Sequence, residues 1–238
     1  MSGSVLIRSL CSTMVDFMSY WQFLFEFGPR LLDGTLVTAI QFLISAVLTT
    51  FIALTVGLMK LSSNIAVRST AIAYIEIFRG TSLLVQIYWI FFVLPLFGIT
   101  LDKFHAGFVA VGLNLGAYGA ELVRGGIQSV PIGQWEAAYS LSMSSPKRMW
   151  RIILPQAVYN LLPAWGNLMI ELLKATALVS LISVADLMFQ AKQINGYTYL
   201  SAQVFGTALI IYYIMARLVV TPLMRGFESL LAQKFGKQ

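Results

Sequence analysis

The chain has 238 residues, of which 58% are hydrophobic and only 11% are charged, and its formal net charge is +6. Because about 25% of the residues in a soluble domain are charged, so little charge cannot cover a water-facing surface. Lipid-facing helices need no charge, and each crossing of a bilayer takes roughly 20 apolar residues. The composition therefore excludes an ordinary soluble domain and predicts a helical membrane protein. The basic residues sit at the ends of apolar runs without interleaved aromatics, which argues against nucleic-acid binding.

The sequence has few residues that could bind a metal and lacks the common nucleotide-binding loop. Cys11 is the single cysteine and His105 the single histidine, so no intrachain disulfide is possible and a buried zinc site would have to rely on carboxylates. The sequence contains no G-x-x-x-x-G-K-[ST] phosphate loop. We therefore expect no metal and no cofactor in this chain, and any energy that its function requires must come from another chain or from an ion gradient.

Residues 1–30 show a helical alternation of polar and apolar positions. The polar positions recur at three- and four-residue steps, and Phe17, Trp21, Leu24 and Phe25 fall largely between them. The pattern predicts an amphipathic helix lying in the membrane interface, with an irregular tail as the alternative. The polar positions are Ser12, Asp16, Ser19, Gln22 and Glu26.

Five apolar stretches follow in chain order. They cover residues 34–59, 69–97, 106–123, 157–182 and 201–222. The second stretch is interrupted by charges but is long enough to cross with tilt. We predict an all-α integral membrane domain of about five transmembrane helices over 31–222, followed by a basic tail over 223–238.

The distribution of Lys and Arg predicts the orientation. Cytoplasmic segments carry an excess of these residues. An outside N-terminus and five crossings make the long polar segment 124–156 cytoplasmic, together with the C-terminus. In that arrangement the inner segments hold Lys60, Arg68, Arg124, Lys147, Arg148, Arg151, Arg217, Arg225, Lys234 and Lys237, against Arg8, Arg30, Lys103 and Lys192 outside.

The polar segment 124–156 has a spaced pattern of residues. A short helix is predicted over 136–143, because Pro131 lies shortly before these residues and Ser145-Pro146 just after them. A second short helix is predicted over 147–154, which stops at Pro155. Between the helices we expect a turn at Ser142, where serine can bond its own backbone, or a break displaced to 144–146. The pattern begins with Glu136, Ala137 and Ala138, and Ser142 follows after three further residues. After another nine residues it ends with Ile152, Ile153, Leu154 and Pro155.

This pattern resembles the EAA loop of ABC-importer permeases, which reads EAA, three residues, Gly, nine residues, I-x-L-P. Every fixed position matches except the glycine, which is Ser142 here. The resemblance implies the type I permease fold in a bacterial inner membrane, with this loop docked as a coupling helix on a separate ATPase. It also implies that the ATPase uses the ATP, and that a second permease subunit, itself or a sister, and an extracytoplasmic solute-binding protein complete the importer.

Charges in the loop are suited to such docking. Glu136 and the cluster Lys147, Arg148 and Arg151 supply charge-assisted contacts for a soluble partner. The alternative is a solvated basic loop that is needed only for topology.

The resemblance extends over most of the chain. Residues 34–38, 76–84 and 116–127 resemble polar amino-acid permeases for histidine, glutamine, arginine or opines, although Ser82 stands where that family usually has proline. Residues 172–190 look closest to permease subunits for ectoine and hydroxyectoine. The implied solute is a small polar or zwitterionic molecule.

Two pairs of charged side chains fall well inside apolar stretches, where each charge costs at least about 2.5–3.5 kcal/mol. Glu76 and Arg79 are three residues apart, as are Glu171 and Lys174, so each pair could meet on one helix face. One interpretation is that they line the translocation path. The other is that the pairs neutralise each other and fix helix packing or a subunit contact.

Small residues mark one face of the third stretch. Gly112, Gly116 and Gly119 would let another helix approach closely, which we interpret as packing rather than as a ligand site. We expect Glu121, near the inner end of this stretch, to make a packing or loop contact.

Two other classes of function remain as alternatives. A secondary transporter or channel working without ATP predicts internal repeats, which are not visible, and leaves segment 124–156 unexplained. An intramembrane enzyme would need a nucleophile–base or metal constellation, and none is present in the sequence. The importer permease is the leading interpretation, and we expect no enzymatic activity.

Overall fold

The computed structural model describes residues 3–235, and every regular element in that range is helical. Its first half contains α1 (Gly3–Lys60), α2 (Ile65–Gly80), α3 (Leu83–Tyr88), the π-helical turn η1 (Trp89–Val93), the 3₁₀ turn η2 (Leu94–Phe97) and α4 (Lys103–Gln128). Its second half contains α5 (Ile132–Ser140), α6 (Ser145–Arg148), the π turn η3 (Met149–Ile153), α7 (Leu154–Thr176), the 3₁₀ turn η4 (Ala177–Ile182), α8 (Leu187–Thr198), α9 (Ser201–Ile214), the π turn η5 (Met215–Val220) and α10 (Thr221–Phe235). The all-α prediction is confirmed.

The number of membrane-spanning helices also agrees with the sequence. Within the described residues, four helical stretches are long and apolar enough to cross a membrane, and a bent pair of helices brings the number to five. The last stretch continues without a break into α10, so residues 223–235 of the predicted tail are helical. The four unbroken stretches are Tyr20–Lys60, Lys103–Gln128, Ser145–Ile182 and Ser201–Phe227.

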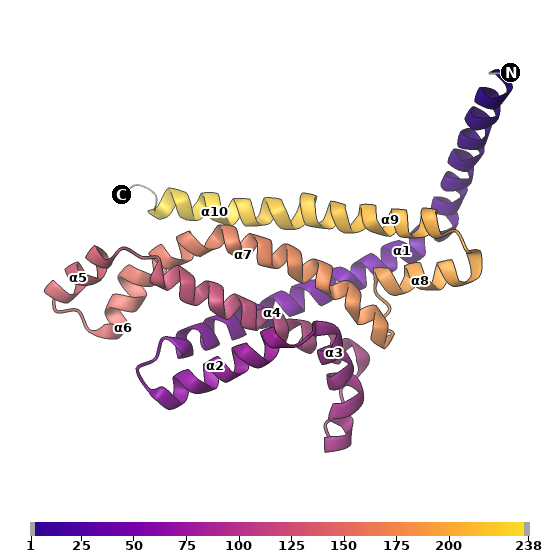
Figure 1. Cartoon of the computed structure of the whole chain (residues 1–238). Coiled ribbons are helices and arrows are strands. Elements are labelled where there is room, and N and C mark those ends of the chain that lie inside the picture. The colour runs from indigo at the N-terminus through magenta and orange to yellow at the C-terminus, as the bar shows by residue number, and fades with distance from the viewer. Residues whose placement is uncertain (1–2, 236–238) are drawn as a thin grey trace.

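The first helix does not divide at residue 30. α1 runs through Pro29 to Lys60, and Figure 1 shows its N-terminal part bending away from the other helices. Phe23, Phe27 and Leu31 are buried against α8 and α9, whereas Trp21 and Phe25, which we placed on the apolar face, are 52% and 81% exposed. The side chains of Ser12, Asp16 and Ser19 lie outside the described part, so an interfacial position of the first residues stays a prediction.

The stretch 69–97 is not one tilted span. α2 and the helix from Leu83 to Phe97 meet at an angle of 104°, because Thr81 and Ser82 adopt extended backbone after Gly80. The break frees the carbonyl of Phe78, which accepts hydrogen bonds from Asn114 Nδ2 (2.9 Å) and Gln86 Nε2 (3.0 Å). An unsatisfied carbonyl is costly in the hydrocarbon region, so these two amides make the break tolerable.

The core forms where α4 packs between α1 and α7. The predicted small-residue face is confirmed, because a Cβ added to Gly112 would lie 2.6 Å from Leu48 Cδ2 and one on Gly119 would lie 2.7 Å from Ala53 Cβ. Gly116 meets Ile52 in the same way, at 2.7 Å. Glycine at these positions therefore lets the backbone of α4 approach α1 closely.

A buried carboxyl group joins three helices at the end of the molecule where α8 lies. Asp186 is fully buried, and it caps α8 by accepting a hydrogen bond from the Phe189 N–H at 2.9 Å. The Tyr212 hydroxyl of α9 donates to its other oxygen at 3.5 Å, and Thr38 of α1 accepts from the neighbouring Leu187 N–H. Burial raises the pKa of Asp186 to about 6.

Adding a methyl group to α4 should be costly only on the face that packs against α1. We expect Gly119→Ala to lower the free energy of unfolding by about 1–3 kcal/mol, because the new Cβ overlaps that of Ala53. Gly125→Ala is the matched control on the same helix, since nothing lies within 4 Å of its added Cβ. Thermal unfolding of both variants in detergent measures the difference, and equal effects would contradict the packing.

Burial of Asp186 should make stability depend on pH. Because its pKa rises from 3.8 in the unfolded chain to about 6, the folded state holds the proton more tightly. Its contribution to stability is therefore largest below pH 3.8 and is lost as pH rises to about 6, by on the order of 3 kcal/mol. We expect Asp186→Asn to flatten this fall, measured by unfolding between pH 4 and 7. The exposed Asp33→Asn is the control, and an unchanged profile in Asp186→Asn would contradict the assignment.

Candidate functional site

The polar segment 124–156 forms an elbow at one end of the molecule. α5 is a short helix, a turn follows, and α6 then leads through η3 into α7. Figure 1 shows α5 and α6 at the same end as the connection between α1 and α2 and the C-terminal end of α10. The segments that the sequence assigned to the cytoplasm are therefore together in space.

The turn of the elbow is centred on Ser142. Its φ angle is +51°, the left-handed region in which glycine is favoured at helix ends. The Ser142 N–H bonds to the Tyr139 carbonyl at 2.8 Å, and the Met143 N–H bonds to the Ala138 carbonyl at 3.2 Å. These two bonds form a Schellman motif, so the break lies at Ser142 and is not displaced to 144–146.

The second arm of the elbow does not stop at Pro155. The helix runs on from Ser145 to Ile182, so the prediction of a separate helix ending at Pro155 is wrong. Pro155 lies in the first turn of α7, directly after the π turn, where its missing N–H is tolerated. The first arm also differs, because α5 covers Ile132–Ser140 rather than 136–143.

The residues of the loop pattern divide between an exposed and a buried set. Glu136 and Ala137 are exposed on α5, and Ser142 is exposed at the turn, whereas Ala138 is buried. Ile152, Leu154 and Pro155 are half-buried on the second arm around the buried Ile153. Glu136 lines an open hollow of about 1210 Å³ that also includes Leu61, Ser62 and Ser63 of the connection between α1 and α2.

A compact apolar cluster attaches the elbow to the membrane helices. Ile153 and Ala157 pack with Ala53 of α1 and with Val123 and Ile127 of α4. Trp135 of α5 packs against the same cluster. The elbow is therefore seated on the ends of three long helices.

One member of the predicted basic cluster is not available at the surface. Lys147 and Arg151 are exposed, but only 8% of Arg148 is exposed, and its guanidinium stacks on the ring of Tyr139. Arg148 therefore offers little surface to a soluble partner, and a contact between the basic cluster and such a partner stays a prediction.

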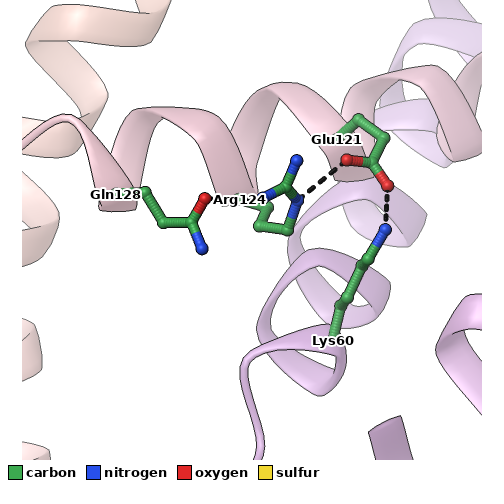
Figure 2. Close-up of polar contacts among 4 residues, drawn as sticks. All are labelled: Lys60, Glu121, Arg124 and Gln128. Atoms are coloured by element: carbon green, nitrogen blue, oxygen red, sulfur yellow. Dashed lines mark hydrogen bonds and ion pairs between the residues drawn. The ribbon is translucent and has the colours of Figure 1, made fainter. Parts of the chain in front are cut away.

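Figure 2 shows a chain of polar contacts beside the elbow, running from the end of α1 along α4. Glu121 pairs with Lys60 at the end of α1 and with Arg124 Nε at 2.8 Å, and Arg124 donates to Gln128 at 2.5 Å. The predicted packing contact of Glu121 is confirmed. Sequence reasoning missed Lys60 as the partner, because 61 residues separate the two and no local spacing indicates the contact.

The charges inside the apolar stretches are exposed and do not form the predicted pairs. Within the described residues, no ion pair joins Glu76 to Arg79 or Glu171 to Lys174. Arg79 instead lies over the ring of Tyr118, with its Cζ 5.1 Å from the centroid, and with Glu76 it lines a hollow of about 290 Å³. Exposed charges at this depth need cover from protein or water, so a role in the translocation path stays a prediction.

Glycine should fit the elbow better than serine does. We expect Ser142→Gly to raise the free energy of unfolding by about 1 kcal/mol, because a non-glycine residue is strained in the left-handed conformation. Ser144→Gly is the matched control, since Ser144 has an ordinary extended conformation and makes no side-chain cap bond. Chemical unfolding in detergent measures both, and stabilisation by Ser144→Gly alone would contradict the turn geometry.

Comparison with known proteins agrees with this architecture. Residues 50–233 match the family model of the binding-protein-dependent transport system inner membrane component. The chain is 48% identical over 179 residues, 73% of its length and 75% of the relative's, to a protein of Sinorhizobium fredii described as a probable amino-acid ABC transporter permease protein, y4tF. It is 39% identical over 171 residues, 72% of its length and 73% of the relative's, to the L-cystine transport system permease protein TcyB of Bacillus subtilis.

Solved structures show the same fold. A chain in a crystal structure of an amino acid ABC transporter with histidines superposes with a TM-score of 0.80 at 38% identity, covering 87% of this chain and 96% of the other. A chain of the MetNI methionine ABC transporter, in an inward-facing conformation, superposes with a TM-score of 0.76 at 20% identity, covering 87% and 98%. The chain therefore belongs to the inner-membrane permease family of binding-protein-dependent ABC importers, in the branch that includes amino-acid permeases.

Proposed function

We propose that this chain forms the translocation path of an ABC importer for a small polar or zwitterionic solute and receives force from a separate ATPase through α5. The observation that carries the proposal is the elbow, in which an exposed short helix bearing Glu136 is joined to the long helix Ser145–Ile182. A loop needed only for topology would not require a defined turn and an apolar seat.

The seat explains how movement of α5 reaches the membrane. Trp135 of α5 packs on the cluster formed by the ends of α1, α4 and α7, and Glu121 ties α1 to α4 beside it. A displacement of α5 by the ATPase would therefore shift three helices together. ATP shifts the conformation of the permease only if the ATPase contacts α5 differently in its two states.

The remaining components follow from this role. ATP is bound by the partner ATPase subunits. A second permease subunit, either another copy or a sister chain, covers the exposed charges, and an extracytoplasmic solute-binding protein delivers the solute. The elbow faces the cytoplasm together with the C-terminus, and the N-terminus lies outside, as the excess of basic residues in the inner segments supports.

The solute class rests on relatives and on charge. TcyB is named for L-cystine and the Agrobacterium fabrum relative NocM, which is 36% identical, for nopaline, and both solutes carry charges of both signs. Glu76, Arg79, Glu171 and Lys174 offer both signs along this chain. We propose a polar amino acid or an ectoine-like compatible solute.

Vesicle uptake tests the mechanism directly. The permease is reconstituted with its ATPase, with the elbow facing the lumen, and the binding protein and radiolabelled solute are added outside. We expect uptake only with ATP in the lumen and both partners present. Uptake by this chain alone, driven by an ion gradient, would establish an ATP-independent transporter or channel instead.

Charge reversal at Glu136 should uncouple solute uptake from ATP hydrolysis. We expect Glu136→Lys to lower uptake at least about tenfold while ATP hydrolysis continues, because a charge-assisted contact to the ATPase becomes a repulsion. Parallel assays of phosphate release and solute uptake measure this. Glu26→Lys, the same change at an exposed position of α1, is the control, and normal uptake by Glu136→Lys would remove α5 from the mechanism.

A further inference from the structure

A guanidinium group is buried inside the elbow without a counter-charge. Arg148 is 8% exposed, and no carboxylate among the described residues pairs with it. Its neighbours Lys147 and Arg151 are exposed. Burying an unpaired charge is costly, so the surrounding groups must offset part of that cost.

Those groups come from both arms of the elbow. The guanidinium carbon of Arg148 lies 3.9 Å from the ring centroid of Tyr139 and 5.8 Å from that of Trp135, and both rings belong to α5. Its Nη2 donates to Ser145 Oγ on α6 at 3.3 Å. The contacts therefore bridge the turn at Ser142 from one arm to the other.

Arg148 has little contact with solvent, although it lies at the wall of the open hollow that also includes Glu136. Its Nε is buried and has no hydrogen-bond partner. Tyr139 is itself 60% exposed, so its ring covers the guanidinium with one face while the pair as a whole stays partly solvated. Opening the angle between α5 and α6 would separate the cation from the rings and leave it without compensation.

We infer that Arg148 is a positioning residue that clamps α5 at a fixed angle to the helix Ser145–Ile182. The clamp makes the elbow stiff, so that force applied to α5 moves the membrane helices instead of bending the turn. This inference rests on the proposed function. It assigns a role to a residue outside the EAA pattern, and that role depends on burial rather than on contact with the ATPase.

The first test measures uptake per ATP hydrolysed in the fully reconstituted transporter. We expect Arg148→Met, which keeps the length of the side chain but removes its charge, to lower this ratio by about two- to fivefold, as loss of a partly solvated cation–π contact allows. ATP hydrolysis itself should change little. Arg148→Lys should retain part of the ratio, since lysine keeps the charge but lacks the planar stacking surface.

Matched variants separate the clamp from loss of surface charge and from misfolding. Arg68→Met removes an exposed arginine from the first turn of α2, which has no part in the proposed ATPase contact, and should leave the ratio unchanged. Tyr139→Phe keeps the ring and should behave as wild type, whereas Tyr139→Ala should reproduce Arg148→Met, and combining the two should add little. If Arg148→Met does not fold, the Tyr139 pair still decides the question.

The second test measures how firmly α5 is held relative to α7. In a Cys11→Ser background, spin labels are attached to cysteines at Gly133 on α5, which has open space around it, and at the exposed Tyr159 on α7. We expect a narrow distance distribution in the parent and a broad one after Arg148→Met. This readout requires neither transport nor ATP.

The outcomes distinguish the proposed importer function from the proposed clamp at Arg148. Absence of ATP-dependent uptake in the parent would reject the proposed function, while the label distances would still test the clamp. An unchanged distance distribution in Arg148→Met would overturn the clamp, whether or not uptake falls. Equal losses of uptake in Arg148→Met and Arg68→Met would also overturn it, because loss of a positive charge would then be the cause.

Discussion

The need to satisfy every backbone polar group within a bilayer governs this structure. Helices satisfy it locally, so a departure from helix at membrane depth requires a specific partner. The break between α2 and α3 shows this requirement, since the freed Phe78 carbonyl is bonded by Asn114 and Gln86. The elbow lies at the end of the helix bundle, where its polar turn can be completed by its own backbone (Figure 1).

Close packing of α1 on α4 links the two ends of the molecule. Glycines on α4 bring the backbones together along their length, and the Lys60–Glu121–Arg124 contacts join them beside the elbow (Figure 2). At the other end, Asp186 caps α8 and holds it against α1 and α9. Both ends of α1 are therefore held against neighbouring helices, which is the connection that the proposed coupling through α5 requires.

Aromatic and apolar groups, rather than surface charges, determine the shape of the elbow. Ser142 accepts the strained conformation of the turn, and Arg148 with Tyr139 bridges its arms. Glu136 is exposed on α5. The elbow therefore combines an interior of aromatic and apolar contacts with an exposed acidic side chain, a division that the sequence pattern alone does not show.

Local patterns in the sequence determined the fold class, the number of apolar stretches, the spacing of the elbow and the small-residue face of α4, because these depend on neighbours three to twenty residues apart. Only the tertiary structure decided the bend after Gly80, the continuation of α7 through Pro155, the pairing of Glu121 with Lys60 and the burial of Arg148. The bend, the ion pair and the burial each depend on a partner from another segment that meets the rest of the chain only on folding, such as Asn114 for the bend and the rings of α5 for Arg148. The continuation through Pro155 depends on the π turn that precedes it. A count of charges could place Arg148 in a basic cluster, but it could not reveal that Tyr139 would cover it.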